Sequence, residues 1–191
     1  MTVCIFASSS SRINIEYAKA ASELGTLLAR ADMDVVFGGG GIGLMGKVAD
    51  SVLENNGRIT GVIPVFMKEE GWDHPGVTKM IITPDMGERK RQMFSLADAV
   101  VALPGGVGTL EELTEAITLK QLGLFRGSII ILNTLNFYRS LTEFLDNMVE
   151  GQFLRDEHKG MWQIVSTPDE VMEYLSRNES WIHDPRSIAK I

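Results

Sequence analysis

The chain has 191 residues, of which 45% are hydrophobic and 23% charged, as is usual for one globular domain. Its 18 Lys and Arg residues against 25 Asp and Glu residues give a net charge of −7 at pH 7, which argues against an extended surface for nucleic acid or for an anionic membrane. This charge does not exclude a small anionic ligand held by a few local donors. The single cysteine, Cys4, excludes an internal disulfide framework and a cysteine-based zinc site, and it fits a reducing cytoplasm.

The N-terminal residues include no basic stretch, and their apolar run is too short for a signal peptide. No segment approaches the roughly 20 apolar residues that a membrane helix needs. We therefore expect a cytoplasmic protein with no membrane partner.

Short apolar runs alternate along the chain with longer segments of helical periodicity. The runs have the length of buried strands, and several are rich in β-branched residues: Val3–Phe6, Val35–Phe37, Ile59–Ile63, Lys79–Ile82, Ala99–Leu103 and Ser128–Leu132. Apolar residues recur at helical spacing within 17–28, 110–122 and 144–149. This alternation predicts an α/β fold, a single Rossmann-like domain over residues 1–191 with a doubly wound parallel sheet and helices on both faces.

Two segments do not follow the alternation. Val65–Val77 carries Gly71, Pro75 and Gly76 among mixed charges, and we expect an irregular loop there. The tail from Arg177 to Ile191 is polar with one tryptophan, Trp181, and we expect it to be disordered or to pack on a partner subunit.

Two glycine-rich turns directly follow predicted strands. One is Gly38-Gly39-Gly40-Gly41-Ile42-Gly43-Leu44-Met45-Gly46, and the other is Pro104-Gly105-Gly106-Val107-Gly108-Thr109. Ligands of such sheets bind beyond the carboxyl ends of the strands, and a helix after each turn would present free N–H groups there. The two turns together predict a ligand that carries phosphate.

Two nucleotide-binding motifs nearly match the first turn. Gly38, Gly40 and Gly43 have the dinucleotide spacing, but they follow the second strand, and residues 58–67 lack the acidic residue expected for NAD. Gly41, Gly46 and Lys47 resemble a Walker A loop, but Val48 stands where a Ser or Thr must hold Mg²⁺. Both interpretations are therefore disfavoured.

Charged residues near the turns carry the candidate chemistry. Thr109 and Glu112 could form a capping box, or Glu112 could face the crevice and stabilise a ribosyl cation. The run Gly87–Met93 could be a solvated helix face, or Arg89 could reach a phosphate or a base. The three histidines, His74, His158 and His183, have no metal-ligand spacing, and we expect no metal site. Ser8 to Ser11 follow the first strand, where we expect most of them to cap a helix.

Four of these motifs occur together in a known family. They are Gly38-Gly39-Gly40-x-x-Gly43-Leu44-Met45-Gly46, Gly61-Val62-Ile63-Pro64, Glu88-Arg89-Lys90-x-x-Met93 and Pro104-Gly105-Gly106-x-Gly108-Thr109-x-x-Glu112. In their order and spacing, over roughly residues 3–175, the chain resembles the Lonely-guy family of cytokinin riboside 5′-monophosphate phosphoribohydrolases. Many members carry an older label of lysine decarboxylase.

The resemblance implies hydrolysis of the N-glycosidic bond of an adenosine-type 5′-monophosphate to the free base and ribose 5-phosphate, with no cofactor. It also implies a homodimer with the pocket near the subunit contact. Arg89 and Glu112 match the catalytic pair. Positions that match substrate-binding residues are Gly39, Gly40, Gly43, Met45, Lys90, Gly105, Gly106, Gly108, Thr109 and Thr118. Whether Glu70 also matches a binding glutamate is left open.

The chain departs from the family pattern at Ser8, Gly87, Val107 and Leu119. These positions surround the expected pocket, so the preference between AMP and a cytokinin nucleotide stays open. A second interpretation also stays open: a carrier that binds a phosphorylated pterin, as molybdenum-cofactor carriers of similar appearance do. Such a carrier would not require both Arg89 and Glu112.

Overall fold

The computed structural model describes residues 1–177, and its strands form one seven-stranded sheet in the order β4-β3-β2-β1-β5-β6-β7. All neighbouring strands pair in parallel. The strands are β1 (Thr2–Phe6), β2 (Asp34–Phe37), β3 (Ile59–Pro64), β4 (Lys79–Thr83), β5 (Ala99–Ala102), β6 (Ser128–Leu132) and β7 (Gln163–Val165). The predicted parallel α/β fold is confirmed.

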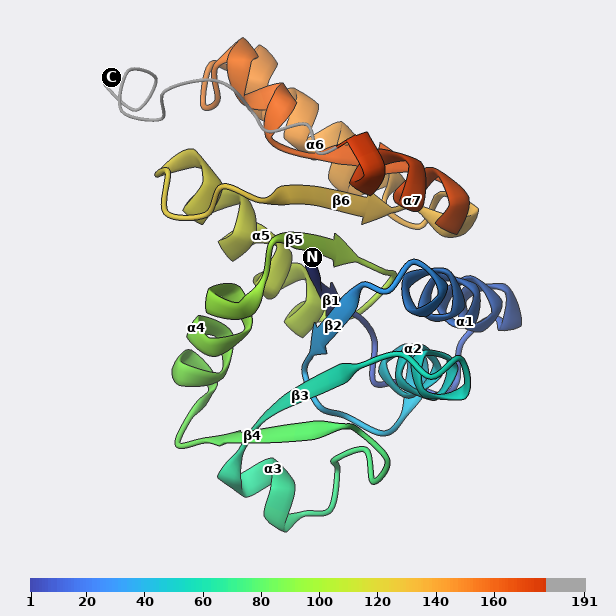
Figure 1. Ribbon diagram of the computed structural model, residues 1–191. Coiled ribbons are helices and arrows are strands. Elements are labelled where there is room, and N and C mark those ends of the chain that lie inside the picture. Colours follow the sequence, from blue (N-terminus) through green and yellow to red (C-terminus); the bar gives the residue numbers. More distant parts are fainter. Residues whose placement is uncertain (178–191) are drawn as a thin grey trace.

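Helices cover both faces of the sheet (Figure 1). They are α1 (Ile15–Arg30), α2 (Gly43–Glu54), α3 (Val65–Glu69), α4 (Met86–Leu96), α5 (Val107–Gln121), α6 (Arg139–Glu150) and α7 (Pro168–Arg177), with short 3-10 helices η1 (Thr134–Asn136) and η2 (Asp156–Met161). None of the helices within residues 1–177 is long and apolar enough to cross a membrane.

The apolar runs form strands because every side chain of a central strand can be buried. In β1, Val3 and Ile5 belong to the core under α1, α2 and α7, whereas Cys4 and Phe6 belong to the core under α4, α5 and α6. Burial on both faces therefore accounts for the unbroken apolar sequence.

The chain reverses its direction across the sheet between β1 and β5. Strands β1 to β4 extend one way from the centre, and after β4 the chain crosses back so that β5 pairs with β1. The carboxyl ends of β1 and β5 are thus the topological switch point, where open α/β sheets bind their ligands.

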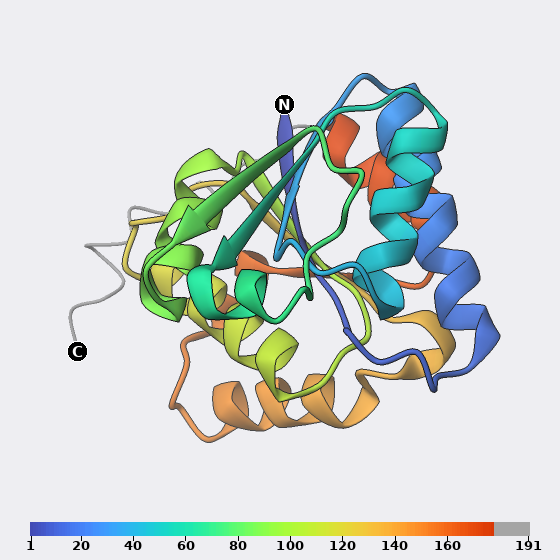
Figure 2. The same cartoon turned by 90° about the horizontal axis from the view of Figure 1, so that it is seen from below.

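Two expectations need correction. The segment predicted as a loop over Val65–Val77 begins with the short helix α3, which lies beside the carboxyl ends of β3 and β4 (Figure 2). The strand β7 was not predicted, because its three residues include only two apolar ones. Arg177 ends α7, whereas the rest of the predicted tail, with Trp181 and His183, lies outside the described residues.

Candidate active site

A cavity of about 640 Å³ opens at the switch point, beyond the carboxyl ends of β1, β2, β3 and β5. Both glycine turns and the charged helices α4 and α5 contribute to its surface. The residues that line it are Ala7, Ser8, Ser9, Ser10, Gly38, Gly40, Ile42, Met45, Ile63, Met67, Trp72, Met86, Arg89, Gly106, Val107, Gly108, Thr109, Glu111 and Glu112.

The second glycine turn presents unused N–H groups to this cavity. Helix α5 begins at Val107, and its N-cap Gly106 makes no side-chain capping bond. Within residues 1–177, no protein acceptor engages the N–H groups of Val107, Gly108 or Thr109, and the first hydrogen bond of the helix runs from Leu110 N to Gly106 O at 3.0 Å. Three such donors and the positive end of a helix dipole are the features that bind anions at helix starts, so this turn is the candidate anion site.

The first glycine turn differs from the prediction. The N–H groups of Leu44 and Met45, at the start of α2, both donate to the carbonyl oxygen of Ser8, at 2.9 and 3.3 Å. These donors are therefore not free for a phosphate. Gly43 has a φ of +69°, and a Cβ there would lie 2.6 Å from the backbone of Ser9, so close backbone packing requires this glycine.

Arg89 projects from α4 into the floor of the cavity. Helix α4 begins after its N-cap Asp85. Arg89 lies on the buried face of this helix, and 7% of the surface of Arg89 is exposed. Its guanidinium donates from Nε to Val62 O at 3.0 Å and from Nη2 to Gly38 O at 2.8 Å. Five donors in a rigid fork allow Arg89 to join β3 and the turn after β2 while Nη1 donates to Met86 Sδ at 3.8 Å and faces Glu112.

Glu112 faces Arg89 across the floor. It is 8% exposed, and its Oε1 lies 3.5 Å from Nη1 of Arg89. Burial raises the pKa of the Glu112 carboxyl to about 7, and the positive charge of Arg89 offsets this rise only in part. A carboxyl with such a pKa can both accept and release a proton near neutral pH.

The structure contradicts the capping alternative for Glu112. Because α5 begins at Val107, Thr109 is a helical residue and Glu112 lies in the second turn. The expected capping role of the serines is also wrong for α1, since its N-cap is Asn14, whose side chain accepts from Glu16 N at 3.0 Å. Ser8, Ser9 and Ser10 line the cavity instead.

Seven predicted site residues meet at the cavity surface: Arg89, Glu112, Gly40, Met45, Gly106, Gly108 and Thr109. Five others do not line it. Gly39 and Gly43 have positive φ and shape the first turn. Gly105 leaves room for Thr109, because a Cβ at position 105 would lie 2.1 Å from Oγ1 of Thr109.

Lys90 and Thr118 are the remaining two. The ammonium group of Lys90 pairs with Glu111 and, at 2.6 Å, with Glu115 on α5. Thr118 is exposed on α5, and its hydroxyl donates to Thr114 O at 2.9 Å. Glu70, which the sequence left open, caps the C-terminus of α3 and does not line the cavity.

An apolar wall faces these polar groups, and the sequence reasoning missed it. Its residues come from four separate segments: Ile42, Met45, Ile63, Met67, Trp72 and Met86. The Trp72 ring is half exposed and meets Phe66 edge to face, with the ring centroids 6.5 Å apart. Such a wall suits a flat apolar or aromatic group.

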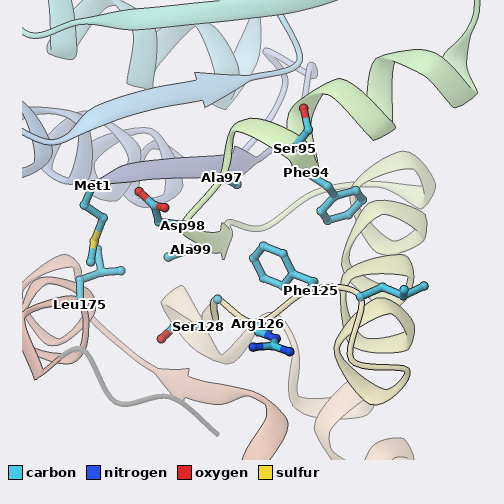
Figure 3. Close-up of a pocket in the computed structure, with 12 residues that line it drawn as sticks. Met1, Phe94, Ser95, Ala97, Asp98, Ala99, Phe125, Arg126, Ser128 and Leu175 are labelled. Atoms are coloured by element: carbon cyan, nitrogen blue, oxygen red, sulfur yellow. The ribbon is translucent and has the colours of Figure 1, made fainter. Parts of the chain in front are cut away.

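A second cavity of about 610 Å³ lies at the opposite ends of the strands, near the amino ends of β5 and β6 (Figure 3). Phe94 and Phe125 meet there edge to face at 6.0 Å, and Asp98 accepts a hydrogen bond from Thr2 N at 2.7 Å. None of the predicted site residues lines this cavity. Among residues 1–177, no three His, Cys, Asp or Glu side chains are grouped as metal ligands would be.

Comparison with known proteins agrees with this geometry. The profile of a family described as "Possible lysine decarboxylase" matches residues 45–175. The chain is 38% identical over 183 residues to cytokinin riboside 5′-monophosphate phosphoribohydrolase LOG1 of Arabidopsis thaliana, covering 93% of this chain and 85% of that one. It is 40% identical over 167 residues to the probable phosphoribohydrolase LOGL9 of Oryza sativa subsp. japonica, covering 87% and 73%.

This chain belongs to the Lonely-guy family. Among solved structures, it resembles the molybdenum cofactor binding protein of Rippkaea orientalis, with a TM-score of 0.69, 21% identity, and coverage of 92% of this chain and 94% of that one. At this identity the likeness shows the fold alone. The Lonely-guy relatives therefore carry the functional comparison.

Proposed function

We propose that the protein hydrolyses the N-glycosidic bond of adenosine-type nucleoside 5′-monophosphates, releasing the free base and ribose 5-phosphate. The observation that carries the proposal is the buried Glu112 carboxyl, paired with Arg89 and adjacent to the free N–H groups of α5. This arrangement supplies an anion site and an ionisable acid on one cavity surface. The relatives named as cytokinin riboside 5′-monophosphate phosphoribohydrolases support the same reaction class.

The cavity suggests an orientation for the nucleotide. The 5′-phosphate accepts hydrogen bonds from the N–H groups of Val107, Gly108 and Thr109 at the start of α5. The ribose lies over Glu112 and Arg89, and the base lies against the apolar wall that includes Met45. Gly40 and Gly106 border the same space without a side chain.

The reaction breaks the bond between C1′ of the ribose and the base nitrogen, and the electron pair leaves with the base. The ribose becomes cationic as this bond lengthens, and the Glu112 carboxylate stabilises that charge. Water then adds to C1′, and Glu112 accepts its proton, which finally reaches the departing base. Arg89 holds the carboxylate in place from a guanidinium fixed by two backbone carbonyls.

Release of the base is the experiment that tests the proposal. We expect adenine and ribose 5-phosphate in equal amounts when the protein is incubated with AMP or an N6-alkylated AMP, and no base from adenosine at the same concentration. Tight retention of a phosphorylated ligand without release of base would contradict hydrolysis and favour the pterin-carrier alternative.

We also propose a cytoplasmic homodimer that does not bind nucleic acid. Exposed apolar side chains along α5 and the turn after it support a second copy as the partner: Val107, Leu110, Leu122 and Leu124. Lys90 and Thr118 lie near this face, and their resemblance to family binding positions fits a pocket close to the subunit contact. Light scattering on the wild type and on Leu122→Glu tests the dimer, which the substitution should weaken.

A further inference from the structure

The loop between α3 and β4 is fastened to the first glycine turn. Gly41 N donates to Trp72 O at 3.0 Å, and His74 N donates to Gly39 O at 2.8 Å. Gly40 and Asp73 form an isolated antiparallel bridge between these two bonds. The loop therefore crosses the turn as a short added strand, which brings Trp72 to the cavity.

His74 holds this loop through its side chain as well. The ring is 8% exposed, and Nδ1 accepts a hydrogen bond from Gly76 N at 3.1 Å. Because Nδ1 is an acceptor, Nε2 carries the proton and donates to Oδ1 of Asp50 at 3.0 Å. Asp50 lies on α2, so the imidazole connects the loop with the helix that follows the first glycine turn.

The connection matters for one wall of the cavity only. Trp72 precedes His74 by two residues and lines the cavity with Met67, whereas the α5 residues that line it come from a separate element without a hydrogen bond to this loop among residues 1–177. Without the His74 bridge, the loop keeps its two backbone bonds and the Lys68–Asp73 ion pair, so we expect Trp72 to be held less firmly while the α5 side is unchanged. Ordering a wall before the ligand arrives lowers the entropic cost of binding.

We infer that His74 is a positioning residue: bridging Asp50 and Gly76, it holds the 71–78 loop so that Trp72 forms the base-facing wall of the cavity. The inference concerns the site of the proposed phosphoribohydrolase and rests on that function for its effect on turnover. It predicts that loss of the bridge weakens binding of the whole nucleotide but not of ribose 5-phosphate.

Two single variants and their double test the bridge, His74→Ala, Asp50→Ala and both together. We expect each single variant to raise the KM for AMP about tenfold with kcat within about twofold, since a well-placed hydrogen bond is worth roughly one factor of ten. The double variant should resemble either single one, because both remove the same bridge. The dissociation constant of ribose 5-phosphate, measured by calorimetry, should stay within about twofold.

Amide hydrogen exchange gives a readout that does not depend on the reaction. The backbone amides at positions 41 and 74 should exchange faster in both single variants, while strand amides keep their protection. His158→Ala is the matched control, since His158 is also buried and accepts a backbone N–H, from Arg155, at Nδ1. This control should leave the KM for AMP and the exchange of Gly41 unchanged.

The outcomes separate the two proposals. Absence of base release by the wild type would overturn the proposed reaction, whereas exchange and calorimetry with AMP would still test the bridge. If Asp50→Ala, a change at a half-exposed helix position, left both the affinity for AMP and the exchange of Gly41 as in the wild type, the positioning role would be wrong. Equal weakening of AMP and ribose 5-phosphate would also overturn it.

Discussion

The two glycine-rich turns resemble each other in sequence and differ in what their N–H groups do. In the first turn, the carbonyl oxygen of Ser8 takes the N–H groups of Leu44 and Met45. In the second turn, the N–H groups of Val107, Gly108 and Thr109 have no acceptor among residues 1–177. The first turn therefore uses two of its helix-start donors to pack the chain, whereas the second keeps all three of these donors for a ligand in the proposed site.

The two turns also differ in whether an acidic residue lies near them in the cavity. Glu112 is the sixth residue of α5, the helix that the second turn begins, whereas the sixth residue of α2 is Val48. A phosphate at the second turn would thus lie close to the one buried carboxyl–guanidinium pair of the cavity. Glycine content alone does not distinguish an anion site from a tight connection, since both need close backbone approach.

The largest expected effect comes from the acid of the second turn. Glu112→Gln keeps the shape of the side chain and removes its charge, so we expect kcat for base release to fall about 10²-fold or more. Steady-state assays with AMP measure this loss. Glu115→Gln is the control, because Glu115 lies one helical turn away, pairs with Lys90 and does not line the cavity. Turnover of Glu112→Gln near the wild-type value would remove Glu112 from the mechanism.

Alanine at one glycine of each turn should affect stability in the first turn and ligand affinity in the second. Gly43→Ala places a Cβ 2.6 Å from backbone at a φ of +69°, so we expect it to lower the free energy of unfolding by about 2 kcal/mol or more. Gly108→Ala meets no atom within 4 Å, so the fold should keep or slightly gain stability. Its methyl group instead enters the cavity, and the affinity for AMP should fall about tenfold. Urea titrations and calorimetry measure the two quantities, and the opposite pattern would reverse the roles of the turns.

The raised pKa of Glu112 predicts a pH dependence of stability. The folded protein holds the proton of this carboxyl up to about pH 7, whereas the unfolded chain releases it near 4.5. The stabilisation is therefore complete below the unfolded pKa and is lost as pH rises through 7. Relative to wild type, Glu112→Gln should gain about 2 kcal/mol in the free energy of unfolding between pH 5 and pH 8. A difference that does not change with pH would mean that the carboxyl has an ordinary pKa.

The smallest effect is expected away from both turns. Thr118→Val removes a hydroxyl that donates to Thr114 O on the exposed face of α5, outside the cavity of its own chain. We expect kcat/KM for AMP to change less than about twofold in protein diluted to the monomer. A larger change that appears only at concentrations where the dimer forms would mean that Thr118 acts across the subunit contact.

The sequence predicted the sheet well, because buried parallel strands consist of unbroken apolar runs and six of the seven have that signature. Arg89 and Glu112 were predicted as a pair by resemblance, and the second glycine turn predicted that a helix follows β5. The sequence could not predict that the N–H groups of Leu44 and Met45 are already hydrogen-bonded, since their acceptor at Ser8 is more than 30 residues away from Leu44 along the chain. The capping alternative failed because it depended on a helix start three residues too late.

The apolar wall could not be predicted from the sequence either, because it is formed by residues from separate segments of the chain. Trp72 and Met86 lie on separate elements and carry no motif, and Trp72 reaches the cavity through the loop that crosses the first glycine turn. Aromatic and methionine residues at irregular spacing resemble ordinary core residues. A signal could have come from Trp72 standing in a polar, glycine-containing loop, where an aromatic side chain has little core to enter.

Amide chemical shifts report which of the two glycine turns binds the phosphate of AMP. AMP is titrated into ¹⁵N-labelled Glu112→Gln protein, in which slow turnover keeps the nucleotide intact. The N–H signals of Val107, Gly108 and Thr109 should move strongly downfield as they bond to the phosphate, while those of Leu44 and Met45 stay nearly fixed. Large shifts at Leu44 and Met45 with none at 107–109 would contradict the account.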